Sequence, residues 1–384
     1  MIFQKHCPGC FVDKSSLPVC PHCGYAESAP RSPLFLPHGL VIGGQFRIGR
    51  VLGQPGGYGI SYLAWDVHLQ QRVAIKEYLP RALAGRSAAA SDVRVHAPEH
   101  RVAFDEGLER FVHEARLLAR LQHPNVVNVR SFFRAHGTAY LVMDYYEGVS
   151  LRDYLAALDQ DRVDARTAVA LLGPVLLGLD FVHRHGIVHR DIKPQNIYLT
   201  TGEASGARAI LLDFGAARQQ ANETIRSGMA VMLSEGYAPL EQYQRNSEQG
   251  PATDVYGVAA TLYRMITGTV PPPAPERIGR DAVATRKDLQ PPAFATVLRQ
   301  GLAPRAQDRY ASAAAFQRAL YEALELPGAL PPAATADAGR APRSRAARWR
   351  TGWRQSRWRG TELIAAAIVI GAAMIALGLR FRPL

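Results

Sequence analysis

The stretch over residues 187–196 constrains this chain most, because it gathers three side chains that handle phosphate within a few positions. It reads Ile-Val-His-Arg-Asp-Ile-Lys-Pro-Gln-Asn, between an apolar helix-like run and a strand-like run. It supplies a carboxylate at Asp191, a cation at Lys193 and an amide at Asn196. Asp213 follows seventeen residues after Asn196 and opens an Asp-Phe-Gly triplet. Asp191, Asn196 and Asp213 together could accept a hydroxyl proton and hold divalent cations, which is the equipment of phosphoryl transfer.

A glycine-rich turn lies upstream, between two strand-like runs at 46–52 and 60–65. Glycine lets the backbone approach phosphate oxygens that a Cβ would hold away. Lys76 ends a buried apolar strand, where an ammonium group is costly unless an anion meets it. Both features predict a phosphate-bearing ligand in this region. The glycines of the turn are Gly53, Gly56, Gly57 and Gly59.

Taken in order, these motifs resemble those of Hanks-type serine/threonine protein kinases, over roughly residues 46–325. The Asp-x-Lys-Pro form of the catalytic loop is typical of the serine/threonine class. The resemblance implies an α+β, bilobal protein-kinase fold, with a small β-rich N-lobe and a larger α-helical C-lobe, in a domain at 44–325. It also implies ATP and Mg²⁺ (or Mn²⁺) as cofactors, and proteins as substrates.

The resemblance implies a role for each residue of the two central motifs. Asp191 would be the catalytic base that takes the substrate hydroxyl proton, and Lys193 would steady the γ-phosphate. Asn196 and Asp213 would hold magnesium between the phosphates. His189 and Phe214 are expected to pack rather than to react.

The nucleotide site is implied by residues in the first half of the domain. Lys76 would meet the α- and β-phosphates. Glu114, on a helix predicted over 104–121, would pair with Lys76, with Glu109 and Glu106 as alternatives. The hinge that binds adenine would contain Met143, Asp144 and Tyr146.

Two stretches depart from the family's pattern. The glycine loop carries one extra residue, Pro55, so that Gly56, Gly57 and Gly59 match the pattern more safely than Gly53 does. Residues 78–100 form an Ala- and Arg-rich insertion whose role the sequence does not indicate.

The activation loop, residues 213–241, offers Thr224 and Ser227 as autophosphorylation sites. Arg190, just before the base, could pair with a phosphate there. Ser234 takes the place of a residue that in the family contacts the base and its neighbouring lysine. Three further residues resemble the family's structural set: Glu241 and Arg309 as a buried ion pair, and Asp254 as the helix residue that holds the catalytic loop.

All four cysteines lie in the first 23 residues, as two Cys-x-x-Cys pairs. Two such knuckles present four thiolates in tight turns, which suits tetrahedral Zn²⁺. We expect a short zinc-ribbon-like segment at 1–26 that holds structural zinc, followed by a linker at 27–43. The alternative is a redox pair or unpaired thiols. The four cysteines are Cys7, Cys10, Cys20 and Cys23.

The far end of the chain concentrates the positive charge. The formal net charge is +12, and residues 340–384 carry +9 of it, with ten Arg and one Glu. Residues 326–360 read as a basic Pro-, Ala- and Arg-rich linker, and 361–380 as one transmembrane helix. Eight Arg before the uncharged run at 363–379 and two after it predict a single pass through the cell (inner) membrane with the kinase domain cytoplasmic. Small residues in the span could favour a homodimer, and no nucleic-acid partner is expected.

The sequence therefore predicts a membrane-tethered bacterial serine/threonine protein kinase that transfers the ATP γ-phosphate to protein hydroxyls. Two rivals stay open. One is a pseudokinase scaffold, which the irregular glycine loop favours, and the other is a small-molecule kinase on the same fold.

Overall fold

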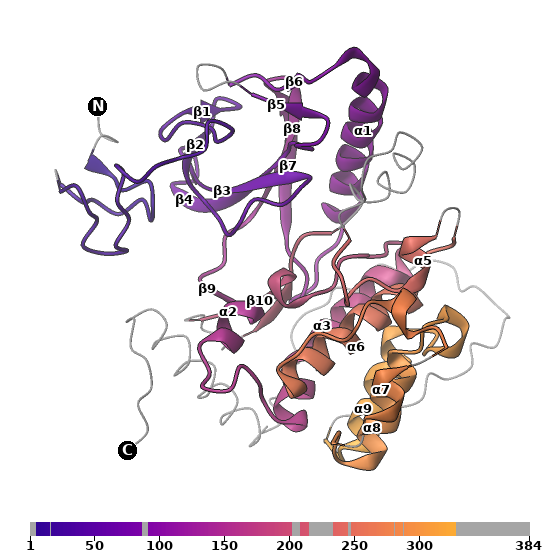
Figure 1. The fold of residues 1–384 in the computed structure, drawn as a ribbon. Coiled ribbons are helices and arrows are strands. Elements are labelled where there is room, and N and C mark those ends of the chain that lie inside the picture. Colours follow the sequence, from indigo (N-terminus) through magenta and orange to yellow (C-terminus); the bar gives the residue numbers. More distant parts are fainter. Residues whose placement is uncertain are drawn as a thin grey trace, which may run out of the picture.

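An antiparallel sheet in the first part of the chain and a helical bundle in the rest form two lobes in this computed structural model (Figure 1). The structure describes residues 5–15, 17–86, 91–201, 208–214, 233–244, 247–279, 281–286 and 288–327. The predicted division into a β-rich N-lobe and a helical C-lobe is present. The predicted transmembrane helix at 361–380 lies outside the described residues.

Six strands of the N-lobe form one antiparallel sheet in the order β1-β2-β3-β4-β8-β7. Successive side chains of a strand point to opposite faces of the sheet, and parts of β3 and β4 accordingly alternate between buried and half-buried residues, whereas β8 is buried on both faces. In β4, for example, Val73 and Ile75 are buried on one face and Lys76 emerges on the other. The strands are β1 (Val41–Ile42), β2 (Phe46–Val51), β3 (Gly59–Asp66), β4 (Gln71–Tyr78), β7 (Val129–Ala135) and β8 (Thr138–Asp144).

One long helix, α1 (Arg101–Leu118), packs against this sheet (Figure 1). It begins and ends three residues before the predicted bounds. Its buried residues recur every three or four positions, as a helix with one apolar face requires. They include Phe104, Leu108, Phe111, Ala115 and Leu118.

Helices α3 (Ala165–Arg184) and α6 (Pro251–Thr267) form the core of the C-lobe. Side-chain caps mark several helix starts: Asp164 accepts from the Thr167 N–H, and Ser312 accepts from the Ala315 N–H. Within the described residues, α3 is long and apolar enough to cross a membrane, but it is a buried core helix. The other helices are α2 (Leu151–Ala156), α5 (Leu240–Tyr243), α7 (Ala282–Thr285), α8 (Pro292–Gly301) and α9 (Ala313–Ala323), with short 3₁₀ turns η3 (Pro194–Asn196), η6 (Ala274–Arg277) and η7 (Ala306–Asp308).

A small sheet connects the lobes' junction to the catalytic motifs. It contains β9 (Gly148–Ser150), β10 (Ile197–Thr200) and β11 (Ala209–Leu211), with β10 in the middle. The turn η3 and β10 directly follow the catalytic loop, and Asp213 comes two residues after β11. This sheet therefore fixes where both motifs lie.

The two stretches expected to be a linker and an insertion pack against the N-lobe. In the predicted linker at 27–43, Leu36 and Ile42 are buried and β1 joins the main sheet. The insertion forms a two-stranded hairpin, β5 (Ala84–Gly85) with β6 (Arg94–Val95), and a 3₁₀ turn η2 (Pro98–His100) before α1. Apolar residues spaced along both stretches explain the difference, because burying them outweighs the freedom of a loose chain.

Candidate active site

Asn196, Lys193 and Ser234 each lie within hydrogen-bond distance of the Asp191 carboxylate. The Asn196 amide nitrogen donates to Asp191 Oδ2 at 2.8 Å, and Lys193 Nζ lies 3.1 Å from the same oxygen. Ser234 Oγ donates to Asp191 Oδ1 at 3.1 Å and accepts from Lys193 Nζ at 3.0 Å. The predicted contact of Ser234 with both residues is thus present. Because the Asn196 nitrogen is committed to Asp191, its oxygen is the atom that can face a metal ion.

Asp254, at the start of α6, holds the backbone of this loop. Its carboxylate accepts from the His189 N–H at 2.8 Å and from the Arg190 N–H at 2.7 Å. It also contacts His183 Nε2 at 2.7 Å, a partner that the sequence did not indicate. Burial raises the pKa of Asp254. The His183 hydrogen bond and the other donors together lower the pKa by a larger amount, so that the net shift is downward. Arg190 has a φ of +66°, so these contacts stabilise a conformation that L-residues rarely adopt.

His189 is a neutral packing residue, as predicted. Burial lowers its pKa. Its Nδ1 accepts from the Asp191 N–H at 3.2 Å, which leaves the proton on Nε2 for the Leu212 carbonyl at 2.7 Å. The Phe214 ring packs on the imidazole with centroids 4.5 Å apart. The catalytic loop and the Asp-Phe-Gly segment are therefore joined through one imidazole.

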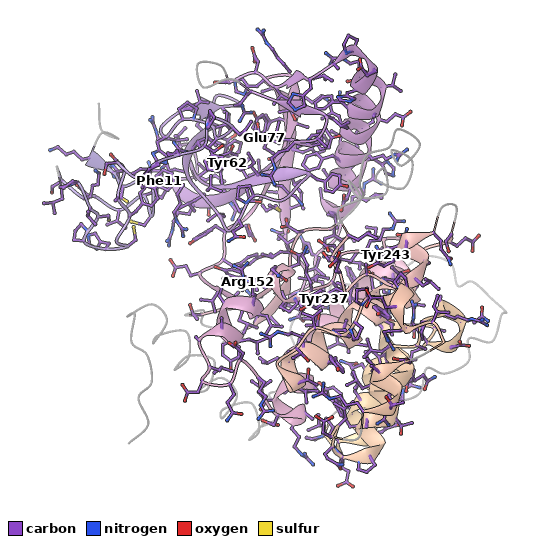
Figure 2. All side chains as sticks on the ribbon, in the orientation of Figure 1. Phe11, Tyr62, Glu77, Arg152, Tyr237 and Tyr243 are labelled. Carbon is purple, nitrogen blue, oxygen red and sulfur yellow. The ribbon has the colours of Figure 1, made fainter. Side chains whose placement is uncertain are left out.

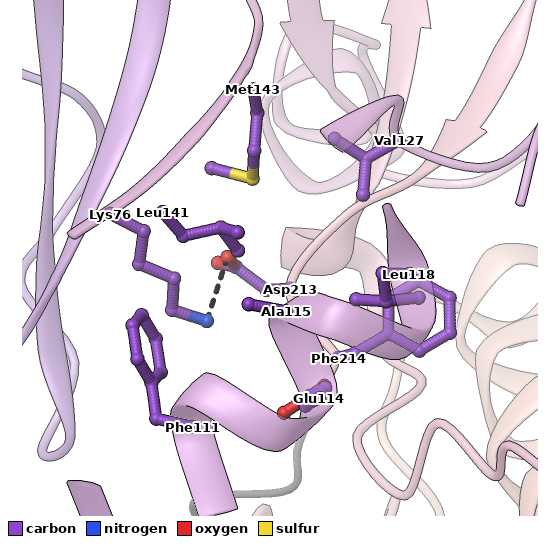
Figure 3. Close-up of a pocket in the computed structure, with 10 residues that line it drawn as sticks. All are labelled: Lys76, Phe111, Glu114, Ala115, Leu118, Val127, Leu141, Met143, Asp213 and Phe214. Carbon is purple, nitrogen blue, oxygen red and sulfur yellow. Dashed lines mark ion pairs between the residues drawn. The ribbon is translucent and has the colours of Figure 1, made fainter. Parts of the chain in front are cut away.

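Lys76 reaches across the pocket to Asp213, with Nζ 3.0 Å from Oδ1 (Figure 3). Among the described residues, the ion pair of Lys76 is with Asp213, whereas Glu114, the predicted partner, lines the same pocket. Burial raises the pKa of Asp213, but the charge and hydrogen bond of Lys76, with the nearby charges of His189 and Lys193, together bring its pKa below the ordinary value. Burial lowers the pKa of Lys76, but Asp213, Glu114 and Asp191 together bring its pKa above the ordinary value. Both groups are therefore charged at neutral pH.

The pocket around this pair is mostly apolar on its other walls. Figure 3 shows Phe111 and Glu114 on α1, with Met143 above the ion pair. Such a cavity, apolar with a few convergent charges, is typical of a small-molecule site. Its remaining apolar lining residues are Ala115, Leu118, Val127, Leu141 and Phe214.

The glycine loop connects the end of β2 at Val51 to the start of β3 at Gly59. Gly53 has a φ of +63°, which explains a glycine there. A Cβ at Gly59 would lie 2.4 Å from the Glu77 carbonyl oxygen, so β3 and β4 can only meet at this point through glycine. At Gly56 a Cβ would meet no atom within 4 Å. Packing therefore does not require a glycine there, and the missing side chain leaves space for a ligand. The Gly57 carbonyl accepts from the Arg81 N–H at 3.0 Å.

The side chains of the predicted hinge are used within the protein. Asp144 accepts from Asn128 Nδ2 at 3.0 Å and contacts Arg130. The Tyr146 hydroxyl accepts from the Asn128 N–H at 3.3 Å. These contacts tie the Asp144 and Tyr146 side chains to the protein, whereas the Met143 side chain lines the pocket.

The predicted structural ion pair between Glu241 and Arg309 is present and buried. Arg309 Nη1 lies 2.7 Å from Glu241 Oε1, and Nη2 donates to Oε2 at 3.0 Å. Thr253 also donates to this carboxylate at 3.0 Å. The predicted phosphorylation sites Thr224 and Ser227 lie outside the described residues.

The four cysteines meet at one point. Their sulfur atoms all lie within 4.8 Å of one another. Cys7 and Cys23 sulfurs are 3.6 Å apart, and those of Cys10 and Cys20 are 3.8 Å apart. The Gly9 N–H donates to Cys7 Sγ at 3.2 Å. Each knuckle is closed by one antiparallel bridge, between His6 and Asp13 and between Val19 and Ala26.

A buried polar cluster beside Lys76 was missed by the sequence reasoning. Glu77 is fully buried and pairs in two-pronged fashion with Arg86 of the insertion. The hydroxyls of Tyr62 and Tyr140 donate to the same carboxylate at 3.2 and 2.9 Å. Figure 2 shows Tyr62 and Glu77 together inside the N-lobe. Arginines are common along the insertion, so no local signal distinguishes Arg86.

Comparison with known proteins shows which family has this sequence and this fold. The protein kinase domain model matches residues 46–309. Pkn1, a serine/threonine-protein kinase of Myxococcus xanthus, is 31% identical over 73% of this chain and 38% of its own length. PknJ, a serine/threonine-protein kinase of Mycobacterium tuberculosis, is 33% identical over 61% of this chain and 35% of its own length. The chain thus spans about a third of the length of these curated relatives.

A solved structure, the apo form of PpkA-294, is similar in fold and sequence. It superposes with a TM-score of 0.65 at 33% identity, over 75% of this chain and 99% of that one. Residues 46–309, which the protein kinase domain model matches, contain the catalytic loop, Asp213 and the lysine strand described above. The chain that carries them belongs to the protein kinase family.

Proposed function

We propose that the protein is a serine/threonine protein kinase that transfers the ATP γ-phosphate to protein hydroxyls in bacterial signalling, including its own. The observation that carries this proposal is the hydroxyl of Ser234, which donates to Asp191 and accepts from Lys193. A substrate hydroxyl presented at Asp191 would meet the same acceptor and the same cation. The serine/threonine-protein kinases among its relatives support the same reaction.

In this mechanism the chain's own residues orient the substrate hydroxyl and offset the negative charge of the phosphates. ATP and magnesium, when bound, supply the phosphoryl group and offset its charge. Asp191 orients the hydroxyl and takes its proton as the oxygen–phosphorus bond forms, and Lys193 steadies the transferred group as a point charge. The Asn196 oxygen and the Asp213 carboxylate are oxygen donors of the kind that magnesium prefers. Lys76 holds the phosphates, and Glu114 adds negative charge beside it.

The test is phosphate transfer from radiolabelled ATP to a generic protein substrate and to the chain itself. Asp191→Asn should remove label from both, while Asp105→Asn, an exposed residue of α1, should keep it. Circular dichroism would show that both variants fold. Absence of label on protein with the wild type would favour the pseudokinase scaffold, and label on a small molecule alone would favour the small-molecule kinase.

We propose in addition that Cys7, Cys10, Cys20 and Cys23 hold one structural Zn²⁺. A zinc–sulfur distance of about 2.3 Å places tetrahedral sulfurs about 3.8 Å apart. The sulfur distances of 3.6 and 3.8 Å agree with that edge length. Metal analysis of purified chain should find one zinc per chain, and Cys20→Ser should lower it. Chain without zinc and insensitive to a chelator would refute the site.

The tail and the activation loop carry two further proposals. The uncharged run at 363–379, flanked by the asymmetric arginines, supports a single membrane pass with a cytoplasmic kinase domain. Chain ending at 327 should leave the membrane fraction of cells. Autophosphorylation at Thr224 or Ser227 should appear in peptide maps of active chain and vanish from Asp191→Asn.

A further inference from the structure

The cysteine segment, defined here as residues 5–26, docks on the strand that leads into the glycine loop. The Arg50 N–H donates to the Pro8 carbonyl at 2.8 Å, and Arg50 Nε donates to the Gly9 carbonyl at 2.9 Å. The register between β2 and β3 shifts between Ile48 and Val51, so Arg50 lies in a bulge. A bulge leaves a backbone group of its strand unpaired. The first cysteine knuckle supplies the acceptor for that group.

Side-chain packing seals the same contact. Phe11 is 7% exposed, and its ring lies 5.8 Å from the Trp65 ring on β3. A Cβ at Gly49 would lie 2.4 Å from the Pro8 carbonyl oxygen and 2.9 Å from the Phe11 ring. Figure 2 places Phe11 where the cysteine segment meets the N-lobe. The knuckle and the sheet thus fit closely at a position that only glycine allows.

The docked groups belong to the knuckle's own turn. Pro8 and Gly9 stand between Cys7 and Cys10, and Phe11 follows directly with a φ of +61°. The orientation of the two carbonyls and of the ring is therefore set by the turn that the four sulfurs close. Small segments of this kind fold only when their metal is bound.

The contact points lie on the two strands that carry the glycine loop. Gly49 and Arg50 are on β2, which ends at Val51, and Trp65 is on β3, which starts at Gly59. The Leu52 N–H then donates to the Ser61 carbonyl at 2.7 Å, which closes the base of the loop. A change at the knuckle therefore reaches the glycine loop directly, and reaches Asp191 only through the rest of the fold.

We propose that the metal-bound cysteine segment is a clamp that positions the glycine loop for the nucleotide's phosphates. This proposal rests on the kinase and zinc proposals above. Phe11 and Arg50 act as positioning residues, because they touch β2 and β3 and not the nucleotide. Loosening the clamp should weaken nucleotide binding and leave the transfer step itself unchanged.

The experiment compares three full-length variants with the wild type: Phe11→Ala, Arg50→Met and Val12→Ala. Val12 neighbours Phe11 but is 42% exposed, so it is the matched control. Each is measured for zinc content, for binding of ADP with Mg²⁺ by calorimetry, and for KM of ATP and kcat. Phe11→Ala and Arg50→Met should keep one zinc and raise Kd and KM about fivefold, equivalent to about 1 kcal/mol, with kcat unchanged.

The outcomes separate the clamp from the proposals beneath it. Fully zinc-loaded Phe11→Ala with wild-type Kd and KM would overturn the clamp while leaving the zinc site and the kinase intact. A fall in kcat at constant KM would mean lost folded chain and would also overturn it. Wild type that binds no zinc would remove the clamp's basis without touching kinase activity. Should Phe11→Ala fail to fold, Arg50→Met, which keeps the side chain's alkyl stem, decides by the same readouts.

Discussion

Replacing Arg86 with Ala should destabilise the N-lobe strongly, although Arg86 lies in an insertion outside the family's motifs. The Arg86 and Glu77 side chains are 1% and 0% exposed, so neither charge has access to water. Burial lowers the pKa of Arg86, but the hydrogen bonds and charge of Glu77, with Tyr62 and Tyr140, together bring its pKa above the ordinary value, so the guanidinium stays charged. The substitution leaves the carboxylate with two tyrosine hydroxyls and no cation.

The expected loss follows from that geometry. Removing one partner of a buried ion pair costs about 3–5 kcal/mol. The hydroxyls of Tyr62 and Tyr140 still donate to Glu77, so we expect the lower end, about 3 kcal/mol. That is a large part of the stability of about 5–15 kcal/mol that a folded domain has in total. Arg86 also donates to the Leu34 carbonyl at 3.0 Å, so the preceding segment should loosen too.

Urea unfolding of the full chain, followed by circular dichroism, measures the change. Arg134→Ala is the matched control, because its ion pair with Glu109 is exposed and is expected to contribute little to stability. The double variant Glu77→Gln with Arg86→Met removes both charges and should recover part of the loss. A loss below about 1 kcal/mol for Arg86→Ala, or a double variant no more stable than the single one, would refute the reasoning.

Three further predictions concern other parts of the structure. Arg309→Ala should cost about 3–5 kcal/mol in the same urea assay, because it leaves Glu241 buried without its cation; Arg309→Lys, which cannot make both contacts, should fall between. Gly59→Ala should raise the KM of ATP by about tenfold or more, since the new Cβ meets the β4 backbone and shifts the loop; a wild-type KM would contradict this. Burial and the Arg31 charge lower the pKa of His38 to about 4, below its ordinary value near 6.5. The folded state therefore resists protonation, and stability should be lost as pH falls from about 6.5 toward 4. His38→Gln should flatten that slope in melting temperature against pH, and an unchanged slope would assign the acid sensitivity elsewhere.

The motif residues could be predicted from the sequence because their chemistry leaves few residue types to choose from. A base, a point cation and metal-binding oxygens need Asp, Lys and Asn at fixed spacing, and these lie together around Asp191 as expected. The strands and α1 were predictable from periodicity. Pairings between distant residues were not, because nothing local selects a partner. Lys76 pairs with Asp213 in this structure, and Arg86 was one arginine among many.

The docking of the cysteine segment is a second contact between distant residues that the sequence alone did not predict. The four cysteines were recognisable by spacing alone, yet their contact with the sheet depends on the missing Cβ of Gly49. A glycine inside a strand signals a close approach without naming what approaches. The partner, the Pro8 carbonyl, lies some forty residues earlier in the chain and could only be found in the fold.

The small three-stranded sheet ties the end of the hinge to the catalytic loop and to the Asp-Phe-Gly segment. It links β9, just after the hinge, to the strand that follows Asn196 and to the one that precedes Asp213. The Tyr198 hydroxyl donates to the Gly148 carbonyl at 2.7 Å and secures the hinge end of this sheet. Asp191, Asn196 and Asp213 are therefore joined through this sheet, whereas Lys76 and the glycine loop belong to the N-lobe sheet. A separation of the lobes would break the 3.0 Å contact between Lys76 and Asp213 and leave the hydrogen bonds of the catalytic loop in place.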